Sequence, residues 1–153
     1  MDMQIRRDDL TSPEIRALLL QHQQHMHSIS PPESCHVLGM DGLRDVSVTF
    51  WSVWDGGELL GCGALKQLDA RHGEIKSMRT VDAHRRKGVA QTMLTYIIEE
   101  AGRRAYSRLS LETGSQTEFV PAQQLYLRNG FAYCGPFADY IVDPNSVYMT
   151  REL

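Results

Sequence analysis

MRTVDAHRRKGVA, residues 78–90, is the stretch on which the prediction of the fold depends. A strand ends within it, a short basic loop follows, and a helix begins at Gly88. Unpaired backbone N–H groups point outward from the start of a helix, and the helix dipole adds about half a positive charge there. Gly88 lets an anion approach the backbone, and Arg85, Arg86 and Lys87 add charge and directional donors. A basic triplet alone would favour a solvated turn, but this placement favours a phosphate-binding loop.

Regular patterns on both sides of this loop predict the neighbouring elements. After the loop, apolar residues recur every fourth position from Val89 to Ala101, which predicts an amphipathic helix to about Arg104. Before the loop, alternating residues and glycine turns predict three successive strands at 46–54, 58–68 and 74–81.

The rest of the chain adds shorter elements. We expect a first strand at 3–7, a helix from 13 to about 25, a loop at 28–45, a strand around 109–111, a helix at 121–129, and final strands at 131–134 and 147–152. An antiparallel meander followed by strand–helix–strand–helix–strand predicts an α/β protein, with a mixed sheet and helices on its faces.

Composition limits the class of protein. The chain has 153 residues, enough for one domain over residues 1–153, and a formal net charge of −3, which argues against a nucleic-acid partner. No apolar run approaches the roughly 20 residues of a membrane span, and the first residues lack a secretory signal, so we expect a cytoplasmic protein without a membrane partner.

Cysteine and histidine spacing does not indicate a metal site. Three scattered cysteines form no framework, and Cys62 and Cys134 are interpreted as small strand or core residues. His22 and His25 have no metal-binding context, so we interpret them as a solvated edge of the first helix.

Two motifs carry a family resemblance. Residues 85–90, RRKGVA, resemble the (Gln/Arg)-x-x-Gly-x-(Gly/Ala) motif of the GNAT acetyltransferases. They are preceded by EIKSMRT at 74–80 and followed by AQQLYLRNGF at 122–131, which looks like the second signature of that family. The order and spacing also match, so the resemblance covers nearly the whole chain.

The resemblance implies a fold and a cofactor. The fold would be the GNAT fold, whose mixed, mostly antiparallel sheet has a V-shaped splay between two central strands and helices on both faces. Acetyl-CoA would be the acetyl donor and no metal would be needed. The pyrophosphate would lie on the basic loop, while the pantetheine arm would pair with a strand edge, as an added peptide strand does. The implied cofactor-binding residues are Met78, Arg79, Thr80, Arg85, Arg86, Lys87, Gly88, Val89, Ala90 and Asn129.

The resemblance also implies direct attack of an amine on the thioester. Tyr126 matches the tyrosine that protonates the departing sulfur, and a backbone N–H near residues 78–80 would stabilise the oxyanion. For the base we expect Glu74, which in strand alternation shares a face with Lys76, Met78 and Thr80. Glu112 and a water molecule remain alternatives.

The acceptor is expected to be a primary amine of a small molecule or peptide. Its site should lie among residues 28–45, 114–120 and 135–146. The polar candidates there are Glu33, His36, Arg44, Gln116, Glu118, Tyr140 and Asp143. Carboxylates would favour a cationic amine, whereas Arg44 or Arg79 could hold a carboxylate, as in an amino acid. The chain could also form a homodimer. The alternative function is an inactive acyl-CoA-binding regulatory module, but Tyr126 favours the enzyme because a module that only binds has no need of it.

Overall fold

The structure is a computed structural model, in which residues 1–31 and 39–153 are described. Its elements are β1 Gln4–Arg7, α1 Pro13–Ile29, α2 Met40–Leu43, β2 Val48–Asp55, β3 Glu58–Asp69, β4 His72–Thr80, α3 Val89–Arg103, β5 Arg108–Gly114, α4 Val120–Arg128, β6 Ala132–Cys134 and β7 Ser146–Glu152. The predicted helices and strands are therefore confirmed, with small shifts at their ends. Helix α2 lies within the predicted loop at 28–45, and residues 32–38 of that stretch are outside the described residues. Helix α1 runs beyond the predicted His25 because Met26 is buried, and the Ser30 N–H closes the last turn on the Met26 carbonyl.

The strands form one mixed sheet. Their order is β1-β2-β3-β4-β5-β7-β6, and among the described strands only β4 and β5 pair in parallel. The expected mixed, mostly antiparallel sheet is therefore confirmed. None of the helices in the described ranges is both long and apolar enough to cross a membrane.

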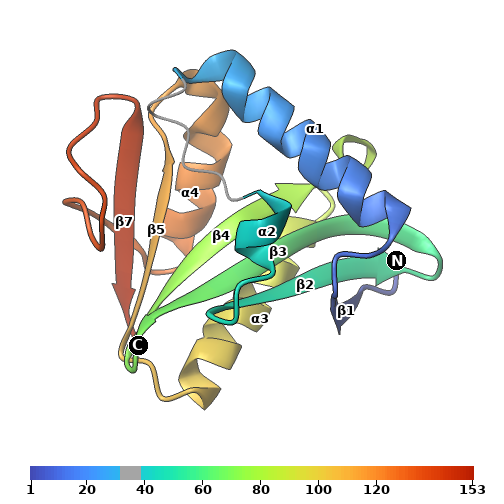
Figure 1. Ribbon diagram of the computed structural model, residues 1–153, viewed down its shortest axis with the longest axis horizontal. Coiled ribbons are helices and arrows are strands. Elements are labelled where there is room, and N and C mark those ends of the chain that lie inside the picture. Colours follow the sequence, from blue (N-terminus) through green and yellow to red (C-terminus); the bar gives the residue numbers. More distant parts are fainter. Residues whose placement is uncertain (32–38) are drawn as a thin grey trace.

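Helices cover both faces of the sheet (Figure 1). Strand alternation in β2 directs Val48 and Phe50 into a core with α1, and Trp51 and Val53 into a core with α3. Helix α4 contributes Tyr126 to the second core. Helices α1 and α2 therefore lie on one face, called here the α1 face, and α3 and α4 lie on the other, the α3 face.

The sheet splays between β4 and β5. Their parallel pairing joins His72–Ile75 to residues 108–111 and then stops, although β4 continues to Thr80 and β5 to Gly114. Figure 1 shows the two strands together at one end and apart at the other, with α4 behind the opening. The predicted V-shaped splay is thus present, and it leaves the edge of β4 after Ile75 without a strand partner.

A bulge in β4 corrects one prediction. Ser77 has φ 55°, and the pairing of β3 with β4 shifts register between Cys62 and Ala64. The extra residue rotates the strand, so Met78 packs on the α3 face, where a Cβ on Gly63 would meet its sulfur. The expectation that Glu74 shares a face with Met78 and Thr80 is therefore wrong, because Thr80 also lies on the α3 face, opposite Gly61. Lys76 does lie beside Glu74.

Candidate active site

A cavity of about 680 Å³ opens at the splay. Its lining includes residues of α1, of β4 from Glu74 to Thr80, of the start of α3 and the loop before it, of the end of β5 and of α4. Most of the residues selected from the sequence line it. They are Glu74, Met78, Arg79, Thr80, Arg85, Arg86, Gly88, Val89, Ala90 and Tyr126.

The start of α3 forms a cradle for an anion at one end of the cavity. Gly88 is the N-cap with φ 85°, and a Cβ built on it would meet no atom within 4 Å. No side chain caps the helix, so the first N–H groups of α3 are available to a ligand. Arg85 and Arg86 add positive charge, whereas Lys87 lies outside the lining with its ammonium 3.2 Å from Nδ1 of His84.

Tyr126 lies in the wall that α4 contributes. Its side chain is 6% exposed and packs edge-on against Phe131, with ring centroids 5.7 Å apart. Within the described ranges its hydroxyl has no hydrogen-bond partner, and burial raises its pKa above the usual value near 10. The hydroxyl is therefore protonated at neutral pH and can donate to a ligand in the cavity.

Glu74 is held in a polar cluster on the α1 face. Its carboxylate accepts a hydrogen bond of 2.6 Å from the Tyr140 hydroxyl, and the Lys76 ammonium lies 3.1 Å away. The ammonium also donates to the Tyr140 oxygen at 3.0 Å. Glu74 thus already has two partners, which limits its freedom to receive a proton from a ligand.

Glu112, the alternative to Glu74, is a carboxyl group whose pKa is raised. Burial raises this pKa to about 7, Ser146 and the charge of Lys76 oppose the rise, and the charges of Glu74 and Asp143 add to it. Glu112 also lines the cavity, beyond the end of the β4–β5 pairing. A carboxyl group with this pKa gains and loses a proton readily near neutral pH.

Two histidines reach the cavity from α1. His22 and His25 both line it, and burial lowers the pKa of His22 to about 4, helped by the charges of Arg79 and His25. The interpretation of His22 as part of a solvated helix edge is therefore wrong. Sequence periodicity placed both histidines on α1 but could not show that α1 lies against the splay.

Asn129 lies outside the cavity lining. Its side chain exchanges hydrogen bonds of 2.8 and 2.9 Å with Gln91 of α3 and donates to the Leu125 carbonyl at 2.7 Å. The residue thus joins α4 to α3. Gln91 itself lines the cavity, and nothing in its sequence context indicated this.

The predicted acceptor residues separate in space. Tyr140 and Glu118 line the cavity, whereas Gln116 binds Asn145 at 3.2 Å. Glu33 and His36, like Cys35, lie outside the described residues. The other cavity residues that the sequence did not single out are Met26, Ile75, Ser77, Met93, Thr113, Phe119, Pro121, Ala122, Leu125 and Arg128.

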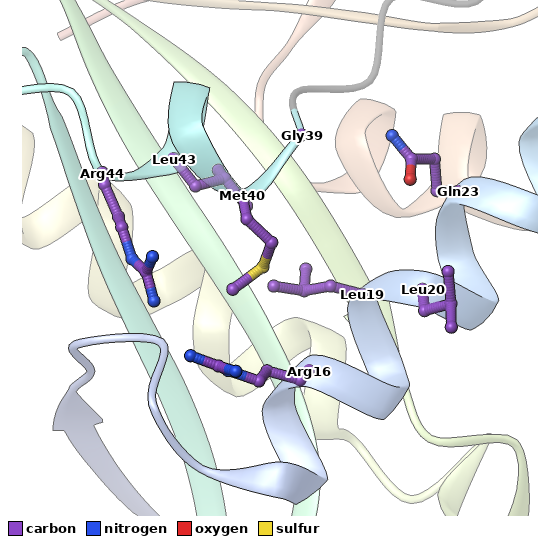
Figure 2. Close-up of a pocket in the computed structure, with 8 residues that line it drawn as sticks. All are labelled: Arg16, Leu19, Leu20, Gln23, Gly39, Met40, Leu43 and Arg44. Atoms are coloured by element: carbon purple, nitrogen blue, oxygen red, sulfur yellow. The ribbon is translucent and has the colours of Figure 1, made fainter.

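Arg44 lies in a second hollow of about 270 Å³ between α1 and α2 (Figure 2). Figure 2 shows the Leu19 and Met40 side chains reaching toward each other between the two helices. Arg16 and Arg44 both donate to the Leu10 carbonyl, at 3.2 and 3.4 Å. Arg44 is not part of the cavity at the splay.

Among the described residues, Cys62 is the one cysteine that lines the cavity, and its thiol is not activated. Burial raises the pKa of the thiol to about 12, and its sulfur lies 3.2 Å from the Ser77 carbonyl. Cys62 is buried in the core with α1, as the sequence predicts for a small strand residue. Across residues 1–31 and 39–153, no three His, Cys, Asp or Glu side chains are grouped so as to hold a metal ion.

Comparison with known proteins decides the family. The model of the acetyltransferase (GNAT) family matches residues 12–131. This chain belongs to the GNAT family. It is 59% identical over 151 residues to the uncharacterized N-acetyltransferase YsnE of Bacillus subtilis, covering 99% of this chain and 100% of that protein. It is 52% identical over 149 residues to the uncharacterized N-acetyltransferase YedL of Escherichia coli, covering 97% and 94%.

Solved structures agree with the fold of a GNAT protein. A Bacillus subtilis acetyltransferase in complex with CoA superposes with a TM-score of 0.73 at 18% identity, covering 99% of each chain. The family and the relatives together make this GNAT chain an N-acetyltransferase enzyme. The expected fold and enzyme class are thus confirmed.

The raised pKa of Glu112 can be tested through the pH dependence of the free energy of unfolding. The folded protein binds more protons than the unfolded chain between pH of about 4.5 and about 7, so buried Glu112 lowers the free energy of unfolding as the pH rises through this window. At pH 8 the substitution Glu112→Gln removes a buried negative charge, so it should raise Tm. At pH 5 the Glu112 carboxyl group is already protonated in the folded protein, so Tm should be nearly unchanged. A gain on the order of 2 kcal/mol corresponds to several degrees in a protein of this size.

Glu99→Gln on the exposed side of α3 is the matched control and should change Tm little at either pH. Equal effects of Glu112→Gln at pH 5 and pH 8 would contradict the raised pKa. The measurement is thermal unfolding followed by circular dichroism in buffers of equal ionic strength.

Proposed function

We propose that this enzyme transfers the acetyl group of acetyl-CoA to a primary amine by direct attack, without an acetylated enzyme. The observation that carries the proposal is the opening between β4 and β5, because it joins an anion cradle, a proton donor and a proton acceptor in one cavity. The buried thiol of Cys62 supports direct attack, since a thiol with a pKa of about 12 is a poor nucleophile at neutral pH.

The cofactor would enter along the α3 face. The pyrophosphate would lie on the backbone cradle at Gly88, Val89 and Ala90, with Arg85 and Arg86 beside it. The pantetheine arm would then bind along the unpaired edge of β4 at Met78 and Thr80, as an added strand. The thioester would reach the splay near Tyr126.

Proton transfer would involve two residues on opposite walls of the cavity. The amine attacks only when it is neutral, and we assign the removal of its proton to Glu112, directly or through water. As the tetrahedral intermediate collapses, the carbon–sulfur bond breaks, and the Tyr126 hydroxyl donates its proton to the departing sulfur. The oxyanion would accept a hydrogen bond from a backbone N–H of residues 78–80.

Glu74 would act as a positioning residue in this scheme. Its bonds to Tyr140 and Lys76 fix the segment after α4 against β4, and its charge contributes to the raised pKa of Glu112. Asn129 would act by holding α4 against α3 through Gln91.

Gly88 permits a test of the phosphate site. Gly88→Val should remove most of the rise in Tm that acetyl-CoA causes, because the added side chain stands where the phosphates must approach the backbone. The matched control is Gly56→Val in the turn between β2 and β3, where the backbone is also left-handed, with φ 58°, and the space is also open. Both variants carry similar backbone strain, so strain alone cannot distinguish them. Only Gly88→Val should lose the rise in Tm that acetyl-CoA causes. A full Tm shift in Gly88→Val would place the phosphates elsewhere.

Tyr126→Phe tests the general acid. The ring and its packing remain, so acetyl-CoA affinity should hold while kcat falls roughly 10²–10⁴-fold, or somewhat less if water partly replaces the hydroxyl. The measurement is free-thiol release with the best acceptor from a panel of amino acids, polyamines, aminoglycosides and peptides. Tyr133→Phe, an exposed tyrosine on β6, is the control. Equal kcat in wild type and Tyr126→Phe, with chemistry rate-limiting, would leave Tyr126 as a packing residue.

A further inference from the structure

Arg79 projects from β4 onto the α1 face. It lies opposite Cys62 in the β3–β4 register, and the Cys62 side chain belongs to the core with α1. The neighbouring residue Thr80 lies opposite Gly61, where an added Cβ would meet Val89 of α3. The Arg79 side chain therefore lies on the α1 face, whereas Thr80 lies on the α3 face.

The charge of Arg79 is incompletely balanced. Its side chain is only 12% exposed, and its Nε is buried without a hydrogen-bond partner in the described structure. The nearest described carboxylate oxygen, Oδ1 of Asp82, is 3.6 Å away and lies closer, at 2.7 Å, to Arg85. Burying a guanidinium with unused donors costs free energy, which a bound anion would recover.

His22 provides a second polar group without a partner. It lines the same cavity from α1, and its Nδ1 is buried without a hydrogen-bond partner in the described ranges. Arg79 and His22 are close enough to influence each other electrostatically. A neutral imidazole beside a guanidinium can donate a hydrogen bond to an anion that the guanidinium holds.

The chemistry of this pair suits a carboxylate. A guanidinium presents parallel N–H donors that match the two oxygens of a carboxylate. Glu112 and Glu118 line the same cavity and offer carboxylates to a cationic group. A cavity lined by both positively and negatively charged side chains matches a ligand that carries both an amine and a carboxylate.

We propose that Arg79, assisted by His22, binds the carboxylate of the acceptor, so that the substrate is an amine that also carries a carboxylate, as an amino acid does. This inference rests on the proposed acetyl transfer and names its substrate class. The acceptor would then be fixed at its acid end on the α1 face, with its amine directed toward Glu112 and the splay.

The experiment compares matched acceptors with wild type and Arg79→Gln. L-amino acids and their amides are supplied with acetyl-CoA at a fixed fraction of neutral amine, and thiol release gives kcat/KM for each. Wild type should prefer the acid over the amide. The ratio should fall about 10–100-fold in Arg79→Gln, because a charge-assisted hydrogen bond contributes about 1.5–3 kcal/mol. Arg79→Lys, which keeps the charge without the planar fork, should lie between the two.

Arg85→Gln is the matched control because it shares the Asp82 carboxylate with Arg79 but lies beside the phosphate cradle. It should weaken acetyl-CoA binding in calorimetry and leave the acid-to-amide ratio unchanged. Equal use of acids and amides by wild type would overturn the carboxylate site while acetyl transfer stands. A loss of acetyl-CoA affinity in Arg79→Gln with an unchanged ratio would assign Arg79 to the cofactor. Absence of thiol release with every amine would overturn both proposals.

Discussion

The structure depends on the point where β4 and β5 stop pairing. Four residues of each strand join in parallel, and beyond Ile75 and Leu111 the strands separate. Backbone N–H and C=O groups that lose a strand partner must find water or a ligand. The sheet thus keeps its continuity at one end and exposes an edge at the other, and the cavity forms at that edge.

The elements around the splay give its two faces different chemistry. On the α3 face, the open start of α3 and the wall of α4 offer backbone donors and one protonated tyrosine. On the α1 face, the bulge at Ser77 turns Arg79 toward α1, and burial raises the pKa of Glu112 to about 7. In the proposed reaction the cofactor binds on the α3 face and the acceptor on the α1 face, so the two meet at the splay, where their reacting atoms can be held close together.

Local signals were enough to predict the elements and the start of α3. The four-residue repeat after Gly88, the basic loop before it and the Ser12 cap of α1 are all short-range patterns. Tyr126 was singled out through the family resemblance, and it lines the cavity. Its role as the general acid stays a prediction.

Other parts of the site depend on contacts that no local pattern encodes. A serine at φ 55° has no sequence signature, so the bulge at Ser77 and the face of Met78 could not be predicted. The pKa of Glu112 depends on burial by segments far away in the chain, and the role of Asn129 depends on Gln91, 38 residues earlier. From the sequence, His22 can only be placed as a polar residue on a helix. It becomes a buried, neutral residue of the cavity because α1 packs beside β4.

Amide hydrogen exchange along β4 tests the central claim most directly. The Val81 N–H donates to the Leu60 carbonyl of β3 at 2.8 Å, so the N–H of Thr80 points to the opposite edge, toward the splay. If the splayed edge receives the pantetheine arm, saturating CoA should slow exchange at Thr80 at least about tenfold, the change expected from about 1.4 kcal/mol, and leave β6 unaffected. Unchanged exchange at residues 76–80 while CoA is bound would contradict the account.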